Sequence, residues 1–161
     1  MFQKKKISLI LVSGGIGLRM GATTPKQYLP LGGVPIALHS FHLFSNMEEI
    51  DELVVVCEEK YQSLFTSSKP LFFAPPGKRR QDSVAQGAAL TSQNTDLLIV
   101  HDAVRPFVKK DEVLALLEKA LSIGAAALAS PCTSTIKEVD ENYLVQKTLD
   151  RTKIWAIQTP Q

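Results

Sequence analysis

Small and cationic residues directly after an apolar segment give the chain a candidate phosphate-binding loop. The segment Ile7–Val12 has the composition of a buried strand, and Arg19 and Lys26 lie shortly beyond it. Four small residues between the strand and Arg19 complete the loop: Ser13, Gly14, Gly15 and Gly17. Glycines let backbone N–H groups approach an anion, and the N-terminus of a following helix adds partial positive charge. The expected ligand is a nucleotide, held through its phosphates.

Two familiar nucleotide-binding motifs do not match this loop. The spacing Gly15-x-Gly17 has Met20 where a dinucleotide fingerprint needs a third glycine, and no acidic residue follows at the required distance. A Walker A loop is also missing, because Gly77-Lys78 lacks its upstream glycine. A turn without a ligand would explain the glycines alone, but the added cations favour a phosphate site.

Asp102 is the candidate metal ligand. The segment His101–Pro106 follows a strand expected at Leu97–Val100, so Asp102 would face the glycine loop across the sheet edge. Mg²⁺ is commonly held by one or two carboxylates together with phosphate oxygens. A helix cap or an ion pair between Asp102 and Arg105 is an equally good interpretation of the sequence. We expect His101 to pack at the strand end rather than to bind a ligand.

The segment Gly77–Ser83 lies between an expected strand and an expected helix. Three cations occur in it, but no aromatic residues accompany them, so they are a weak indication of nucleic-acid binding. At the ligand edge of a sheet, such a loop could instead recognise a base through its backbone groups and the Ser83 hydroxyl.

Composition excludes several classes of protein. The 161 residues are 45% hydrophobic and 21% charged with a net charge of +2, which indicates one globular domain and no general affinity for nucleic acid. No apolar stretch approaches the roughly 20 residues of a membrane span, and the run after Lys6 is too short for a secretory signal. Cys57 and Cys132 are expected to be free thiols. These features favour a cytoplasmic protein with no membrane partner.

Strand-like and helix-like segments alternate along the chain. This pattern predicts an α/β fold with a doubly wound, mostly parallel sheet, whose ligands bind beyond the carboxyl ends of the strands. The expected strands are Ile7–Val12, Leu53–Cys57, Leu71–Ala74, Leu97–Val100 and Ala125–Ala129. The expected helices run from Pro35 to about Ser45, from Gln81 to Leu90 and from Asp111 to Ile123.

The segment Thr133–Thr148 breaks this alternation. Two β-rich pieces, Thr135–Val139 and Tyr143–Thr148, flank a polar turn, which predicts a hairpin. Little core remains for it to join, so we expect an arm at about residues 132–151 that projects from the domain. Exposed strand edges favour pairing with another chain, and we therefore expect a homodimer through this arm.

Taken together, four motifs resemble the 2-C-methyl-D-erythritol 4-phosphate cytidylyltransferase family of the non-mevalonate isoprenoid pathway. They are Gly14–Met20, Pro25-Lys26-Gln27, His101–Pro106, and Asp150-Arg151 with Trp155 and Gln158–Gln161. The resemblance covers essentially the whole chain. It implies a Rossmann-like nucleotidyltransferase fold and a transferase reaction, in which CMP passes from CTP to methylerythritol 4-phosphate and pyrophosphate leaves.

The resemblance also implies roles for individual residues. Arg19 and Lys26 would stabilise the transition state with Arg151, and Asp102 would hold Mg²⁺ or another divalent cation. The implied nucleotide-binding residues are Ser13, Gly14, Gly15, Gly17, Gly77, Ser83 and Ala103. The implied substrate-binding residues are Arg105, Thr135, Arg151 and Thr159. In the family the arm crosses to a second subunit, so Thr135 and Arg151 would complete the partner's site.

Two departures from the family pattern qualify these implications. The loop begins Val12-Ser13-Gly14-Gly15 where the family has Pro-Ala-Ala-Gly, and the chain ends at Gln161 where the family continues into a C-terminal segment with further substrate-side groups. On this basis we expect weak or absent activity from these 161 residues. The alternatives are a ribitol-5-phosphate cytidylyltransferase, a more distant sugar-1-phosphate nucleotidyltransferase, and an inactive, dimerising nucleotide-binding fragment.

Overall fold

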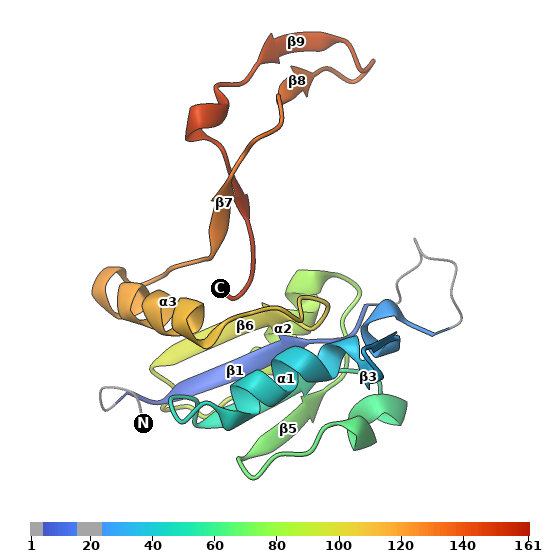
Figure 1. The fold of residues 1–161 in the computed structure, drawn as a ribbon, viewed down its shortest axis with the longest axis vertical. Coiled ribbons are helices and arrows are strands. Elements are labelled where there is room, and N and C mark those ends of the chain that lie inside the picture. Colours follow the sequence, from blue (N-terminus) through green and yellow to red (C-terminus); the bar gives the residue numbers. More distant parts are fainter. Residues whose placement is uncertain (1–4, 16–23) are drawn as a thin grey trace.

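A parallel sheet forms the centre of the computed structural model, which describes residues 5–15 and 24–161. Its four strands are β1 (Ile7–Val12), β4 (Glu52–Val56), β5 (Leu71–Ala74) and β6 (Leu97–Asp102). They lie in the order β5-β4-β1-β6, and each neighbouring pair is parallel (Figure 1). The chain therefore builds outward on one side of β1 and then returns to its other side, which confirms the expected doubly wound α/β topology.

Alternate side chains of β1 pack against opposite layers of helix. Leu9 and Leu11 belong to buried clusters with α1 (Ile36–Asn46), and Leu9 also packs with residues of α3 (Lys110–Ile123). Ile10 packs instead with α2 (Arg80–Ala88) on the other face. The period-two alternation of a strand thus buries β1 on both faces. Within the described parts of the chain, no helix has the length and apolar character needed to cross a membrane.

The three helices lie within two residues of their expected bounds. Pro35 precedes α1 with a φ of −51°, close to the helical value, so its ring preorganises the first turn. Acidic residues occupy the first turn of α3, and Gly124 ends it in the left-handed conformation at a φ of +100°. At the start of α2, the Asp82 carboxylate accepts a 3.1 Å hydrogen bond from the Arg79 backbone amide and also pairs with the Arg79 guanidinium.

One strand is longer than expected and another is absent from the sheet. β6 continues for two residues beyond Val100, because His101 and Asp102 still pair with β1. The expected fifth strand at Ala125–Ala129 is wrong: only β7 (Ala129–Pro131) forms, and it pairs antiparallel with β10 (Trp155–Ile157). The reason is that Gln161 occupies the free edge of β6, exchanging hydrogen bonds of 2.8 and 2.9 Å with the Val100 backbone.

The remaining strands are short and antiparallel. β2 (Pro30–Leu31) and β3 (Val34–Pro35) form a small hairpin before α1. β8 (Lys137–Val139) and β9 (Val145–Thr148) form the hairpin predicted from the sequence. Figure 1 shows β8 and β9 at the far end of a long extension that leaves the sheet through β7 and β10. The arm therefore projects as expected, although its strands are shorter than the sequence indicated.

Candidate nucleotide site at the carboxyl edge of the sheet

A cavity of about 460 Å³ lies where β1, β5 and β6 end. Its position is the one expected for a ligand of a doubly wound sheet. It brings together most of the predicted nucleotide and metal residues that the structure describes, along with several that were not predicted. The lining residues are Val12, Ser13, Gly14, Gly15, Lys26, Gln27, Gly77, Lys78, Arg79, Arg80, Ser83, Asp102 and Val104. Arg19 and Gly17 lie outside the described residues.

Gln27 holds the glycine loop in place. Its side chain is buried, and its Nε2 donates hydrogen bonds of 2.8 Å to the Ser13 carbonyl and 2.7 Å to the Gly15 carbonyl. The Tyr28 hydroxyl adds a contact of 3.1 Å to the Ser13 carbonyl. Because Lys26, Gln27 and Tyr28 form one turn of 3-10 helix, the same turn that carries the candidate cation also fixes the loop. The sequence contained Gln27 in its motif, but nothing in the pattern revealed this role.

Two glycines allow close packing of the backbone around the cavity. A Cβ on Gly14 would lie 2.3 Å from the Cβ of Pro76, and one on Gly77 would lie 2.4 Å from the Cβ of Asp82. Separations this short exclude any side chain without a backbone shift. The Gly77 amide donates a 3.0 Å hydrogen bond to the buried Ser83 hydroxyl, which leaves the hydroxyl proton free to donate elsewhere.

Asp102 is the last residue of β6 and lies beside Val12 of β1. Among the residues that the structure describes, the nearest cation to its carboxylate is Arg80, whose Nε and Nη2 each lie 2.9 Å from Oδ1. Arg105, the partner that the sequence suggested, is farther away, with its Nε 3.8 Å from Oδ2. The backbone amide of Asp102 donates a 3.3 Å hydrogen bond to the hydroxyl of Thr159.

The chemistry around Asp102 is compatible with a magnesium ion that also binds phosphate. The carboxylate is a quarter exposed and faces the same cavity as Lys26. In the described parts of the chain, no three His, Cys, Asp or Glu side chains gather closely enough to hold a metal unaided. A cation at Asp102 would therefore take water or phosphate oxygens as its further ligands, and phosphate oxygens together with one or two carboxylates are how Mg²⁺ usually binds nucleotides.

His101 packs in the core, as expected, and does not reach the cavity. Its ring lies edge-on to Phe44 at 5.0 Å between centroids, and its Nε2 is 3.0 Å from the Arg105 carbonyl. Burial lowers the pKa of His101 to about 4, so the imidazole is neutral near pH 7. A neutral ring that donates through Nε2 fixes the backbone turn that follows Asp102.

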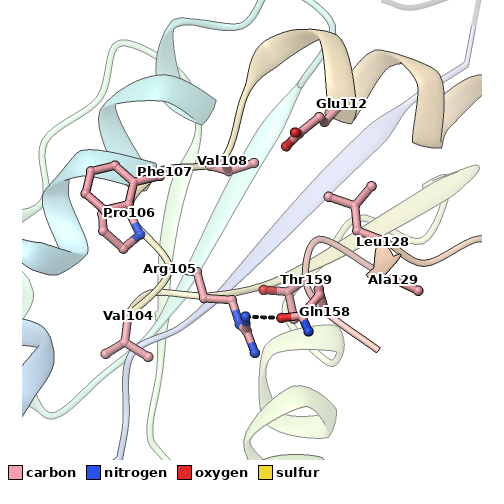
Figure 2. Close-up of a pocket in the computed structure, with 10 residues that line it drawn as sticks. All are labelled: Val104, Arg105, Pro106, Phe107, Val108, Glu112, Leu128, Ala129, Gln158 and Thr159. Carbon is pink, nitrogen blue, oxygen red and sulfur yellow. Dashed lines mark hydrogen bonds between the residues drawn. The ribbon is translucent and has the colours of Figure 1, made fainter. Parts of the chain in front are cut away.

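A second cavity of about 610 Å³ adjoins the first. It contains Arg105 and Thr159, two residues predicted to bind the acceptor substrate, and Arg105 donates to the Gln158 side chain (Figure 2). Its remaining lining is mixed: Val104, Pro106, Phe107, Val108, Glu112, Leu128, Ala129 and Gln158. Val104 and Thr159 connect the two cavities, because Val104 lines both and Thr159 contacts Asp102.

Of the predicted residues that the structure describes, three do not line either cavity. Ala103 is fully buried, and its amide donates to the Val12 carbonyl at 3.0 Å. Thr135 and Arg151 are exposed in the arm, where Nη1 of Arg151 donates to the Thr133 carbonyl at 2.8 Å. The arm residues could therefore act only on a site of another chain, or after the arm moves.

A phosphate-compatible loop at the switch point of a doubly wound sheet, with a carboxylate beside it, is the arrangement of a nucleotide-binding α/β protein. The chain belongs to the 2-C-methyl-D-erythritol 4-phosphate cytidylyltransferase family, whose model matches residues 7–161. The resemblance seen in the sequence motifs is thereby confirmed over nearly the whole chain.

Individual relatives agree with this assignment. The chain is 48% identical to the chloroplastic enzyme of that name from rice, covering 99% of this chain and 55% of the rice protein. It is 49% identical to the enzyme from Chlamydia pneumoniae, covering 97% of this chain and 71% of the relative. The crystal structure of the Francisella tularensis enzyme matches with a TM-score of 0.79 at 30% identity, covering 97% of this chain and 71% of that one. The chain thus spans about half the length of its rice relative.

Proposed function

We propose that this chain transfers CMP from CTP to 2-C-methyl-D-erythritol 4-phosphate, producing 4-diphosphocytidyl-2-C-methyl-D-erythritol and pyrophosphate in the non-mevalonate isoprenoid pathway. The observation that carries the proposal is the pair of adjoining cavities at the carboxyl edge of the sheet. One is lined by the glycine loop, Lys26 and Asp102, and the other by Arg105 and Thr159. A nucleotide donor and a phosphorylated acceptor could then meet near Asp102.

The reaction needs charge stabilisation more than proton transfer. A phosphate monoester has a second pKa of about 6, so the attacking phosphate is largely dianionic at neutral pH. Lys26, together with Arg19, would stabilise the charge that develops on the triphosphate as pyrophosphate leaves. Asp102 would hold Mg²⁺, which when bound would neutralise phosphate charge. Aligned binding of donor and acceptor would supply much of the remaining acceleration.

Cytosine recognition is assigned to Gly77 and Ser83. Their hydrogen bond closes the loop before α2 and places a hydroxyl and backbone groups on the cavity wall. Ser13, Gly14 and Gly15, with Gly17, are assigned to the phosphates and ribose, and Ala103 to the ribose side through its backbone. The roles of Gly17 and Ala103 rest on the family motifs alone, and those of the other residues rest on the motifs and on the cavity lining.

The acceptor side is proposed to be shared between two chains. Arg105 and Thr159 line the second cavity, whereas Thr135 and Arg151 lie in the projecting arm. The arm also exposes apolar residues that a partner could cover: Tyr143, Leu144 and Val145 are 87%, 62% and 60% exposed. We therefore propose a homodimer in which each arm completes the partner's site.

We further propose that the protein binds neither nucleic acid nor membranes. Its proposed location is the cytoplasm. The rice relative is named as chloroplastic, so fractionation of the source cells, with chloroplasts kept separate, is the test of location.

Nucleotide selectivity tests the donor assignment. Titration calorimetry with Mg²⁺ present should show CTP binding at least about tenfold more tightly than UTP. A site that hydrogen-bonds the exocyclic amine of cytosine would leave its own polar groups unpaired when uracil presents a carbonyl at that position. Equal affinity for the two nucleotides would contradict the assignment. If the chain bound CTP but turned over neither 2-C-methyl-D-erythritol 4-phosphate nor ribitol 5-phosphate, a dimerising nucleotide-binding fragment would be favoured instead.

A further inference from the structure

Within residues 5–15 and 24–161, Arg80 makes the closest ionic contact to the candidate metal ligand. Its Nε and Nη2 both lie 2.9 Å from Oδ1 of Asp102, and Nη2 lies 3.4 Å from the side-chain oxygen of Gln161. Arg80 is the first residue of α2, so the contact joins the start of that helix to the end of β6. The sequence pattern showed Arg80 only as one of three cations in a loop.

The contact between Arg80 and Asp102 competes with binding of a cation to the Asp102 carboxylate. The Arg80 Nε donates a hydrogen bond to Oδ1, and Nη2 lies 2.9 Å from the same oxygen, which is one of the two that would face a metal. A divalent cation at the carboxylate would also repel the guanidinium at short range. The Arg80 side chain is 44% exposed, so it can leave without opening the core. It also lines the same cavity as Lys26, where a nucleotide phosphate would lie.

We propose that Arg80 is a positioning residue that changes partners during nucleotide binding. Without a divalent cation it holds the Asp102 carboxylate at the cavity edge and weakens the affinity of that carboxylate for metal. When the cation arrives with the nucleotide, Arg80 releases Asp102 and contacts the nucleotide phosphates. This inference rests on the proposed function of the cavity, and it adds a residue that couples the metal site to the phosphate site.

Neighbouring arginines do not share this position. Arg79 lines the cavity as well, but its guanidinium pairs with Asp82 through Nη2 at 2.9 Å. Arg105 approaches Asp102 only to 3.8 Å and donates to Gln158. Arg79→Met therefore removes one positive charge from the same cavity wall without removing the Asp102 contact, and it is the matched control for Arg80→Met.

The first measurement is Mn²⁺ binding to the nucleotide-free full chain. Electron paramagnetic resonance detects the free ion and so gives the amount of Mn²⁺ bound. Arg80→Met should bind Mn²⁺ about fivefold more tightly than wild type, because a partly exposed ion pair contributes about 1 kcal/mol. Arg79→Met should change the affinity by about twofold or less, since it acts only through general charge. Unchanged or weaker Mn²⁺ binding by Arg80→Met would overturn the proposal. Arg80→Gln repeats the comparison if the methionine variant unfolds.

The second measurement is CTP affinity with and without Mg²⁺. Arg80→Met should weaken CTP binding about fivefold with Mg²⁺ and much less without it, because only the released guanidinium reaches the phosphates. An equal loss of CTP affinity with and without Mg²⁺ would overturn the proposal that Arg80 moves from Asp102 to the nucleotide phosphates. If wild type bound no CTP at all, the proposed function and the phosphate half of the exchange would both fail. The Mn²⁺ comparison would still decide whether Arg80 masks Asp102.

Discussion

Gly14 and Pro76 pack so closely that a Cβ on Gly14 would stand 2.3 Å from the Cβ of Pro76. Gly14 follows β1 and Pro76 follows β5, so this contact locks together two loops that line one cavity. Around Gly15, the next residue, no described residue other than its chain neighbour comes within 4 Å of a Cβ built on it. The two glycines therefore provide a matched pair for testing whether the packing of the loop matters.

Gly14→Ala should destabilise the fold and weaken nucleotide binding, whereas Gly15→Ala should not destabilise the fold. Relieving the clash with Pro76 requires a backbone shift, which costs about 1–3 kcal/mol of unfolding free energy. Gly15→Ala should stay within about 0.5 kcal/mol of wild type, because its new methyl group meets open space. Urea unfolding of the two variants measures the difference. Equal stabilities would show that the loop accommodates a side chain at Gly14.

Lys26→Ala should lower kcat by roughly 100-fold with a smaller effect on KM, because the proposed charge stabilisation is greatest in the transition state. Lys60→Ala is the control: Lys60 is exposed, pairs with Glu58 at 2.9 Å and does not line the candidate cavity. Steady-state pyrophosphate release gives both constants. Turnover near the wild-type value in Lys26→Ala would remove this residue from the catalytic assignment.

Glu52 makes the stability of the fold depend on pH. It is the first residue of β4, at the edge of the sheet opposite the candidate cavity. Burial alone would raise the pKa of Glu52, but hydrogen bonds from Ser8 and Ser92 outweigh it and hold this pKa below its ordinary value. The Ser8 hydroxyl donates at 2.6 Å and the Ser92 amide at 2.7 Å. Because the folded-state pKa is the lower one, the stabilisation is complete above the ordinary pKa of about 4.5 and is lost as pH falls through the folded value.

Glu52→Gln should therefore cost about 2 kcal/mol near pH 7, where the ionised carboxylate accepts these hydrogen bonds. The difference from wild type should shrink below about pH 4, since the wild-type carboxyl is then losing its charge. Urea unfolding at intervals between pH 7 and pH 3 measures the effect. A difference that stayed constant over this range would show that ionisation of Glu52 does not contribute to stability.

The shared acceptor site can be tested by mixing two inactive variants. Lys26→Ala removes a group of the sheet cavity, and Arg151→Ala removes a group of the arm. If each arm serves the partner, a mixed dimer has one intact site, so equal amounts should recover about a quarter of wild-type activity after subunit exchange. If each arm serves its own chain, every site in the mixture lacks one group.

No recovery on mixing, once mass spectrometry has shown that mixed dimers form, would contradict the crossed-arm arrangement. Failure of the wild-type chain to form dimers in sedimentation experiments would contradict it more simply. The exposed apolar residues of the arm would then need another partner.

Local patterns predicted most of the sheet and helices, because their periodicity reports burial directly. β1 and β5 have the expected bounds, and Gly124 ends α3 as a left-handed cap should. The fifth strand failed for a reason that local pattern does not contain. The alanine-rich run after α3 resembles a strand, but the edge of β6 is taken by Gln161, which lies 61 positions further along the chain than its partner Val100.

The site was predictable to the extent that its residues follow strands. Ser13, Gly14 and Asp102 lie at the cavity because strand ends meet at one edge of a parallel sheet. The partners of these residues were not predictable. Gln27 acts on the glycine loop and Arg80 on Asp102 through contacts whose geometry depends on how the helices are placed against the sheet.

Pyrophosphate release from CTP tests the central claim most directly. The chain is supplied with CTP and Mg²⁺, and 2-C-methyl-D-erythritol 4-phosphate or ribitol 5-phosphate is offered as the acceptor in separate reactions. Release should depend on the acceptor and should be at least about tenfold faster with the methylerythritol phosphate, since the buried polar groups of an acceptor site discriminate between substrates. Faster release with ribitol 5-phosphate, or no acceptor-dependent release with either compound, would contradict the proposed function.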